Sequence, residues 1–175
     1  PSKAMAMNKS SEGLLHSFND LPTLINIYRS RFSLGEVGRL IQAHEKVRGF
    51  VYHMVVAARP DTSLTAPFRV PTLGALAAAD VWVPDFAHGQ GNHGGGIGIN
   101  DLFAYGPRTP MLMGYMTQYE RQLSPSGGVA AKIRAVDSEH LLCQQLSAQG
   151  LTVGFARVCV VRVRSDGFVP LPDLR

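Results

Sequence analysis

The feature that most constrains the fold is the apolar run "FVYHMVVAA" at residues 50–58, which is rich in valine. β-Branched side chains in a short, continuous apolar run are typical of a strand that is buried within a sheet. The run ends at Arg59-Pro60-Asp61, because proline has no N–H group to donate to a neighbouring strand. A chain of 175 residues can bury a substantial core around such a strand, and its length corresponds to one domain.

A helical pattern precedes this strand. It begins near Asp20-Leu21-Pro22, where proline suits the first helical position. The segment "SLGE" at residues 33–36 has the form of a capping box, with Ser33 as N-cap and Glu36 reaching back, which predicts a helix start at that point. Gly49 stands where a C-terminal glycine belongs. Between these two signals the residues at helical spacing are Leu34, Val37, Leu40, Ile41, His44 and Val47.

Helical and strand patterns alternate along the rest of the chain. We expect strands at 80–86, near "LFAYG" and within 151–167, and helices at 107–123 and 138–149. Gly150 would end the last helix, and Ser165-Asp166-Gly167 would form a turn. One face of the 107–123 helix would carry Met111, Leu112, Tyr115, Met116 and Tyr119. We predict an α/β fold with a mixed, mostly parallel sheet flanked by helices, in a single domain at residues 20–175 after an irregular lead-in at 1–19.

Composition excludes several classes of protein. Hydrophobic residues make up 45% of the chain and charged residues 17%, which is typical of a globular domain. The net charge is +4, but the basic residues are scattered, so we expect no nucleic-acid surface and rather a small anionic ligand such as a nucleotide. No stretch reaches the ~18 apolar residues of a membrane span. Cys143 and Cys159 are too few for a zinc motif or a disulfide framework and are expected to be buried thiols.

Polar residues follow two of the predicted strands and open one helix. Ligands of open α/β sheets bind at the carboxyl ends of the strands, and Arg59 and Asp61 occupy such a position. Asn100 and Asp101 lie beyond the next strand, and Glu139 opens a helix, where the helix dipole favours an acid. Taken singly, each carboxylate could be a turn or cap residue. Their combination and order predict a functional site.

Three segments, in order along the chain, carry a resemblance. In "HEKVRGFVYHMVVAARPDTSL" (44–64) a helix leads into an apolar strand that closes on Arg-Pro-Asp. In "GIGINDLFAYGPRTPMLMGYM" (96–116) Asn-Asp precedes Phe-Ala-x-Gly and a helix with Met and Tyr. In "DSEHLLCQQLSAQGLTVGFARVCVVRVRSDG" (137–167) a Ser-Glu helix leads into an Arg-rich strand and Asp-Gly. Together, over about residues 25–168, they resemble a family of glycosyltransferase-like proteins with a GT-A-type, nucleotide-diphospho-sugar transferase fold.

The resemblance implies a glycosyltransferase that moves a sugar from a nucleotide-sugar donor to a glycan or other hydroxyl acceptor. A divalent Mn²⁺ or Mg²⁺ would neutralise the diphosphate leaving group, with Asp61 at the place of the metal-binding acidic motif. Arg59 would contact phosphate, and Arg59, Asp61 and Asn100 would form the donor site. An acceptor hydroxyl needs a base, for which the resemblance favours Glu139, with Asp101 positioning the acceptor or serving as the base itself.

A glycine-rich stretch lies next to the predicted site. Six of the ten residues from Gly89 to Gly98 are glycine, which favours a loop whose backbone can approach a ligand and change conformation on binding. It lacks the Gly-Lys-Ser/Thr ending of a phosphate-binding P-loop. The nearby aromatic residues Trp82, Phe103 and Tyr105 would pack on a sugar; the alternative is that they belong to the core.

The sequence departs from the family pattern in two respects. The usual Asp-x-Asp pair is here Arg59-Pro60-Asp61, with one carboxylate, so Asp61 has ribose or sugar as alternative partners. The nucleotide-binding strands that come first in GT-A folds are expected to be missing, so the alternative function is an inactive or truncated GT-A-like domain acting as a binding module. A third, disfavoured hypothesis is a transition-metal site formed by His88, His93, His140 and Cys143.

Overall fold

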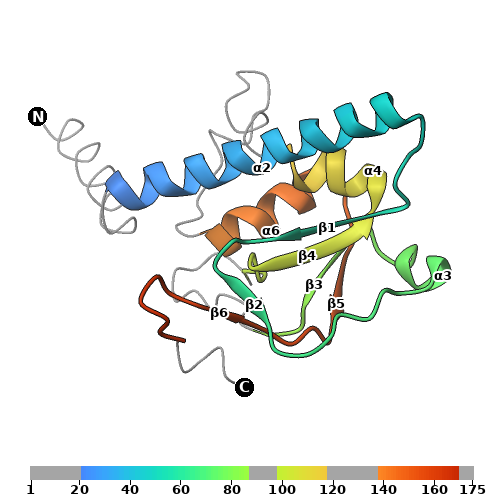
Figure 1. The fold of residues 1–175 in the computed structure, drawn as a ribbon. Coiled ribbons are helices and arrows are strands. Elements are labelled where there is room, and N and C mark those ends of the chain that lie inside the picture. Colours follow the sequence, from blue (N-terminus) through green and yellow to red (C-terminus); the bar gives the residue numbers. More distant parts are fainter. Residues whose placement is uncertain (1–20, 87–97, 118–137, 170–175) are drawn as a thin grey trace, which may run out of the picture.

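The computed structural model describes residues 21–86, 98–117 and 138–169, which form an α/β fold (Figure 1). A four-stranded sheet has the order β1-β4-β3-β5, and a small second sheet pairs β2 with β6. The strands are β1 (Met54–Ala58), β2 (Thr62–Leu64), β3 (Val81–Pro84), β4 (Phe103–Pro107), β5 (Val153–Ala156) and β6 (Val160–Arg162).

The directions of the strands correct part of the prediction. β4 runs antiparallel to both β1 and β3, and β3 and β5 are parallel. A parallel pair needs a long crossover connection, which the chain provides between β3 and β5. The predicted α/β fold with a mixed sheet is therefore confirmed, whereas the expectation of a mostly parallel sheet is wrong for the strands described.

Helices cover one face of the four-stranded sheet (Figure 1). The long helix α2 (Leu21–Arg48) runs above α4 (Arg108–Pro110) and α6 (Ser138–Ala148). A single turn of π-helix, η1 (Met111–Tyr115), continues α4. The short helix α3 (Leu73–Leu76) lies apart from this layer. No helix within the described ranges is both long enough and apolar enough to cross a membrane.

Helix α2 is continuous through Ser33, so the predicted helix start at the capping box is wrong. A capping box acts where the chain enters a helix, and here the chain is already helical. Gly35 and Gly38 instead allow α2 to lie close to Met116: a Cβ atom on Gly38 would lie 3.3 Å from Cβ of Met116. Gly49 ends the helix with a φ of 69° and donates its N–H to the carbonyl of Glu45, as its position predicts.

The later elements agree closely with the sequence pattern. Pro107 directly precedes α4, α6 begins at Ser138, and Gly150 follows α6 with a φ of 69°. Gly167 has a φ of 82° in the predicted turn, where its N–H bonds to the carbonyl of Arg164. The lead-in at 1–19, residues 118–123 of the predicted helix with Tyr119, and most of the glycine stretch lie outside the described residues.

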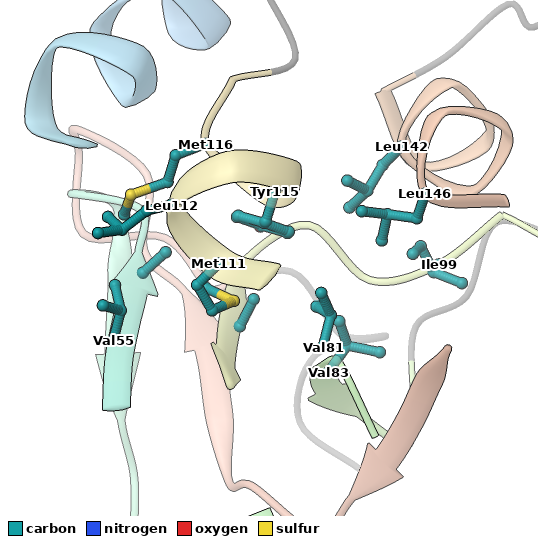
Figure 2. Packing of buried hydrophobic residues seen from close by; sticks show 12 residues of the cluster. Val55, Val81, Val83, Ile99, Met111, Leu112, Tyr115, Met116, Leu142 and Leu146 are labelled. Carbon is teal, nitrogen blue, oxygen red and sulfur yellow. The ribbon is translucent and has the colours of Figure 1, made fainter. Parts of the chain in front are cut away.

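The larger core cluster lies between the sheet and the helices. Figure 2 shows Leu142 and Leu146 of α6 on the side of Ile99, and Leu112 on the side of Val55. The predicted apolar face of the 107–123 helix is thus buried as far as it is described. Full burial of a large apolar side chain stabilises the fold by about 1.5–3 kcal/mol. The cluster consists of Val55, Ala57, Val81, Val83, Ile99, Ala104, Met111, Leu112, Tyr115, Met116, Leu142 and Leu146.

A smaller cluster covers the opposite face of the sheet. Successive side chains of a strand point to opposite faces, so Phe103 and Tyr105 of β4 lie here while Ala104 faces the helices. The same alternation exposes Cys159 between two buried valines, so the expectation of a buried thiol is wrong for Cys159; Cys143 is half-buried. The cluster consists of Leu76, Phe103, Tyr105, Val158 and Val160, with Met54, Phe68, Trp82, Phe86 and Ala156 packed against it.

Candidate functional site

A cavity of about 770 Å³ lies between α2 and the carboxyl end of β1. Its α2 wall carries both apolar and polar side chains, and the charged groups opposite come from three separate parts of the chain, at 59–61, 101 and 164. The charged and hydroxyl-bearing residues around it are Ser30, Arg31, Ser33, Arg59, Asp61, Asp101, Tyr115, Ser138 and Arg164. A concave site with convergent polar groups is the usual form of a small-molecule site.

Arg59 is the centre of this charged group. Its Nε and Nη2 donate to the two carboxylate oxygens of Asp61 at 2.9 and 2.8 Å, and its Nη1 lies 3.4 Å from both oxygens of Asp101. The hydrogen bonds from Arg59 lower the pKa of Asp61, and the same bonds raise the pKa of Arg59. Both groups therefore carry their charges at neutral pH.

The backbone fixes this pair from two sides. The N–H of Arg59 donates to the carbonyl of Leu102 at 3.0 Å, and the turn at Pro60 brings the N–H of Thr62 to the carbonyl of Arg59 at 3.0 Å. The carbonyl of Asp61 accepts from the N–H of Val163 at 2.7 Å. The β2–β6 pairing thus continues to Asp61 and places Arg164 beside the cavity.

Asp101 brings a second carboxylate to Arg59. Its side chain is 11% exposed and accepts a hydrogen bond of 2.5 Å from the hydroxyl of Ser138 at the start of α6. Asn100, which precedes it, is 1% exposed and is absent from the cavity wall. The amide of Asn100 donates to the carbonyl of Phe86 at 3.0 Å and accepts from the N–H of Leu102 at 2.9 Å. Asn100 therefore fixes the turn that presents Asp101, rather than lining the predicted donor site.

Arg31 is a site residue that the sequence reasoning missed. Its side chain is buried, and its Nη2 donates to both the carbonyl and the hydroxyl of Ser138 at 2.9 Å. Burial lowers the pKa of Arg31, yet an arginine stays charged in proteins. The available signal was its spacing from Ile27 and Leu34, which puts a charged residue on the inner face of α2. Burial also raises the pKa of Tyr115 to about 12, so this phenol is neutral.

Glu139 lies close to the site without lining the cavity. Burial lowers the pKa of Arg31 and the charge of Glu139 offsets only part of this, while the carbonyl of Glu139 accepts from the N–H of Ile99 at 3.2 Å. Asp101 lines the cavity wall and Glu139 does not. The geometry therefore favours Asp101 over Glu139 for contact with a ligand.

The three predicted sugar-contacting aromatic residues belong to the core cluster on the opposite face of the sheet. Phe103 and Tyr105 are 2% and 6% exposed, and Trp82 stacks on Tyr105 with ring centroids 6.2 Å apart. The indole N–H of Trp82 donates to the carbonyl of Leu76 at 3.1 Å. None of the three lines the cavity, so their assignment as sugar contacts is replaced by the core alternative.

Two metal sites were hypothesised from the sequence, a disfavoured one formed by histidines and Cys143 and an expected one at Asp61. His88 and His93 lie outside the described residues, and His140 is buried while Cys143 is half-buried. Within 21–86, 98–117 and 138–169, no three side chains of His, Cys, Asp or Glu come together as a metal-ion site. Asp61, the predicted metal ligand, has both carboxylate oxygens bonded to Arg59.

Comparison with protein-family models, curated proteins and solved structures gave no significant match. The function is therefore inferred from the geometry of the site and from the sequence motifs.

Proposed function

We propose that this chain is a glycosyltransferase with a GT-A-type fold, which transfers a sugar from a nucleotide-sugar donor to a hydroxyl acceptor. The observation that supports it is the convergence of Arg59, Asp61 and Asp101 on one cavity. The last of these is 42 positions from the first, and all three were expected at the donor and acceptor sites from the motifs alone.

Arg59 is suited to the donor diphosphate. Nε and Nη2 each make one short contact with Asp61, Nη1 makes only the longer 3.4 Å contacts with Asp101, and the side chain is 34% exposed. The remaining N–H groups can donate to phosphate oxygens, which the planar guanidinium matches in pairs. Arg31 and Arg164 add positive charge around the same cavity, where a diphosphate would bring negative charge.

Asp101 is suited to act as the base. It already accepts a hydrogen bond from a hydroxyl, that of Ser138, which shows that an O–H donor fits its carboxylate. In the transfer, Asp101 takes the proton of the acceptor hydroxyl while the acceptor oxygen bonds to the anomeric carbon. The bond from that carbon to the donor diphosphate breaks, and the diphosphate leaves with the electron pair. We assign this role to Asp101 rather than Glu139 because only Asp101 lines the cavity.

The first test is binding followed by transfer. We expect calorimetric titration of the full chain with UDP, GDP and their sugars to give saturable binding of one nucleotide class. With that donor and a panel of saccharide acceptors, Asp101→Asn should lower turnover about 10²–10⁴-fold while donor binding is retained. Asp85→Asn, an exposed carboxylate away from the cavity, is the matched control. Absence of nucleotide binding by the folded chain would overturn the proposal, and binding without any transfer would favour the alternative, a binding module.

A further inference from the structure

Resting on the proposed function, we propose that the donor diphosphate is held by arginine side chains and that donor binding needs no divalent metal. A GT-A-type transferase is expected to place Mn²⁺ or Mg²⁺ between its carboxylates and the diphosphate. The carboxylates of this site are instead organised around a guanidinium group. The residues present therefore do not fit the metal that the resemblance implies.

The first argument is geometric. Asp61 and Asp101 are the two carboxylates of the cavity wall, and the guanidinium of Arg59 bridges them. Mn²⁺ and Mg²⁺ need several oxygen ligands at close range in a near-octahedral arrangement. To reach both carboxylates, a metal ion would have to take the position of the Arg59 guanidinium, which is bonded to both oxygens of Asp61 and lies 3.4 Å from those of Asp101.

The second argument is the balance of charge. Arg31 and Arg59 already offset Asp61 and Asp101, so these four side chains carry no net negative charge that would attract a divalent cation. The hydroxyl of Ser138 also donates a hydrogen bond to a carboxylate oxygen of Asp101, so this oxygen already has a partner. A metal ion would bring two more positive charges against a fixed cation, whereas a diphosphate would bring charge of the opposite sign.

The third argument is what the arginines offer instead. Arg59 keeps N–H groups for a ligand, and Arg164 is exposed on the rim of the same cavity. An arginine keeps its charge at all physiological pH values and contacts phosphate oxygens in pairs. Asp61 then serves to orient Arg59 rather than to bind metal.

The decisive experiment measures UDP and GDP binding by the full chain in EDTA and in MnCl₂. We expect the affinity for the bound nucleotide to differ by less than about threefold between the two conditions, because no metal bridges protein and phosphate. Binding that disappears in EDTA and returns with Mn²⁺ would overturn the inference and leave the proposed function standing. Absence of binding in both conditions would overturn both.

Two variants sharpen the result. Arg59→Lys should weaken nucleotide binding by about tenfold or more, because lysine cannot form the paired bonds, and the exposed Arg69→Lys should leave it unchanged. Asp61→Asn should bind nucleotide within about tenfold of the parent chain, since the amide oxygen still accepts one of the two hydrogen bonds from Arg59. Loss of binding in Asp61→Asn, with the fold intact by circular dichroism, would contradict the inference and favour a metal ligand at that position.

Discussion

Glu45 is a buried carboxylate that ties the end of α2 to the start of α4. It accepts from Nε and Nη2 of Arg108 at 2.6 and 2.5 Å and from the N–H of Tyr52 at 3.0 Å. The hydrogen bonds from Arg108 lower the pKa of Glu45 from 4.5 to about 2. A carboxylate with a depressed pKa stabilises the fold above its unfolded pKa, and that stability is lost as the pH falls from about 4.5 toward 2.

We therefore predict that the chain is less stable to urea at pH 3 than at pH 7, and that Glu45→Gln reduces this difference by lowering the midpoint mainly at pH 7. Urea unfolding followed by circular dichroism at both pH values checks it. Glu36→Gln is the control, because Glu36 pairs with Arg39 on the exposed side of α2, where ion pairs contribute little. An equal effect of Glu45→Gln at both pH values would exclude the ion pair as the cause.

The residues of the site differ in how far the sequence could predict them. Arg59, Asp61 and Asp101 were expected because chemistry-bearing residues follow strands, and the structure brings these three together. Arg31 and Ser138 were missed because their roles depend on which helix face turns inward, and a single sequence gives no partner for that face. The aromatic residues were misassigned for a related reason: the alternation within β4 decides which face of the sheet they occupy.

Strand β4 depends on a residue without a side chain. A Cβ atom on Gly106 would lie 2.4 Å from the carbonyl oxygen of Asp80 and 3.1 Å from Cγ of Met111. The first neighbour is backbone and cannot turn away, so we predict that Gly106→Ala destabilises the fold by about 1–3 kcal/mol. Gly74→Ala in α3, where a Cβ meets nothing within 4 Å, should instead be neutral or stabilising. Thermal unfolding of both variants tests the pair, and equal stability of Gly106→Ala and the parent chain would contradict the predicted clash.

At the level of elements, the sequence predicted which helices and strands exist better than it predicted their limits and their directions in the sheet. The strand before Arg59 and the helix closed by Gly150 follow from apolar periodicity and end signals, which are local. Helix α2 continues through Ser33 and lies close to Met116 at Gly35 and Gly38, a tertiary contact that no local signal reports. Strand direction is likewise a tertiary property, because β4 enters the sheet between β1 and β3 and runs against both.

The molecule as a whole has two core clusters that share one sheet, because β4 contributes Ala104 to one and Phe103 to the other. Neither cluster can lose its packing without disturbing that strand, so we predict that the described parts unfold in one cooperative transition.

Leu142→Ala in the larger cluster should lower the free energy of unfolding by about 2–5 kcal/mol, and Phe103→Ala in the smaller cluster by about 3–5 kcal/mol, with the slope against urea unchanged. Val70→Ala, at a side chain that is 71% exposed, should have little effect. Urea unfolding is followed by two signals. Circular dichroism reports the helices and strands, and the fluorescence of Trp82 reports the smaller cluster, against which this side chain packs. Transitions that separate between the two signals in either core variant would mean that the clusters unfold independently and that the shared strand does not couple them.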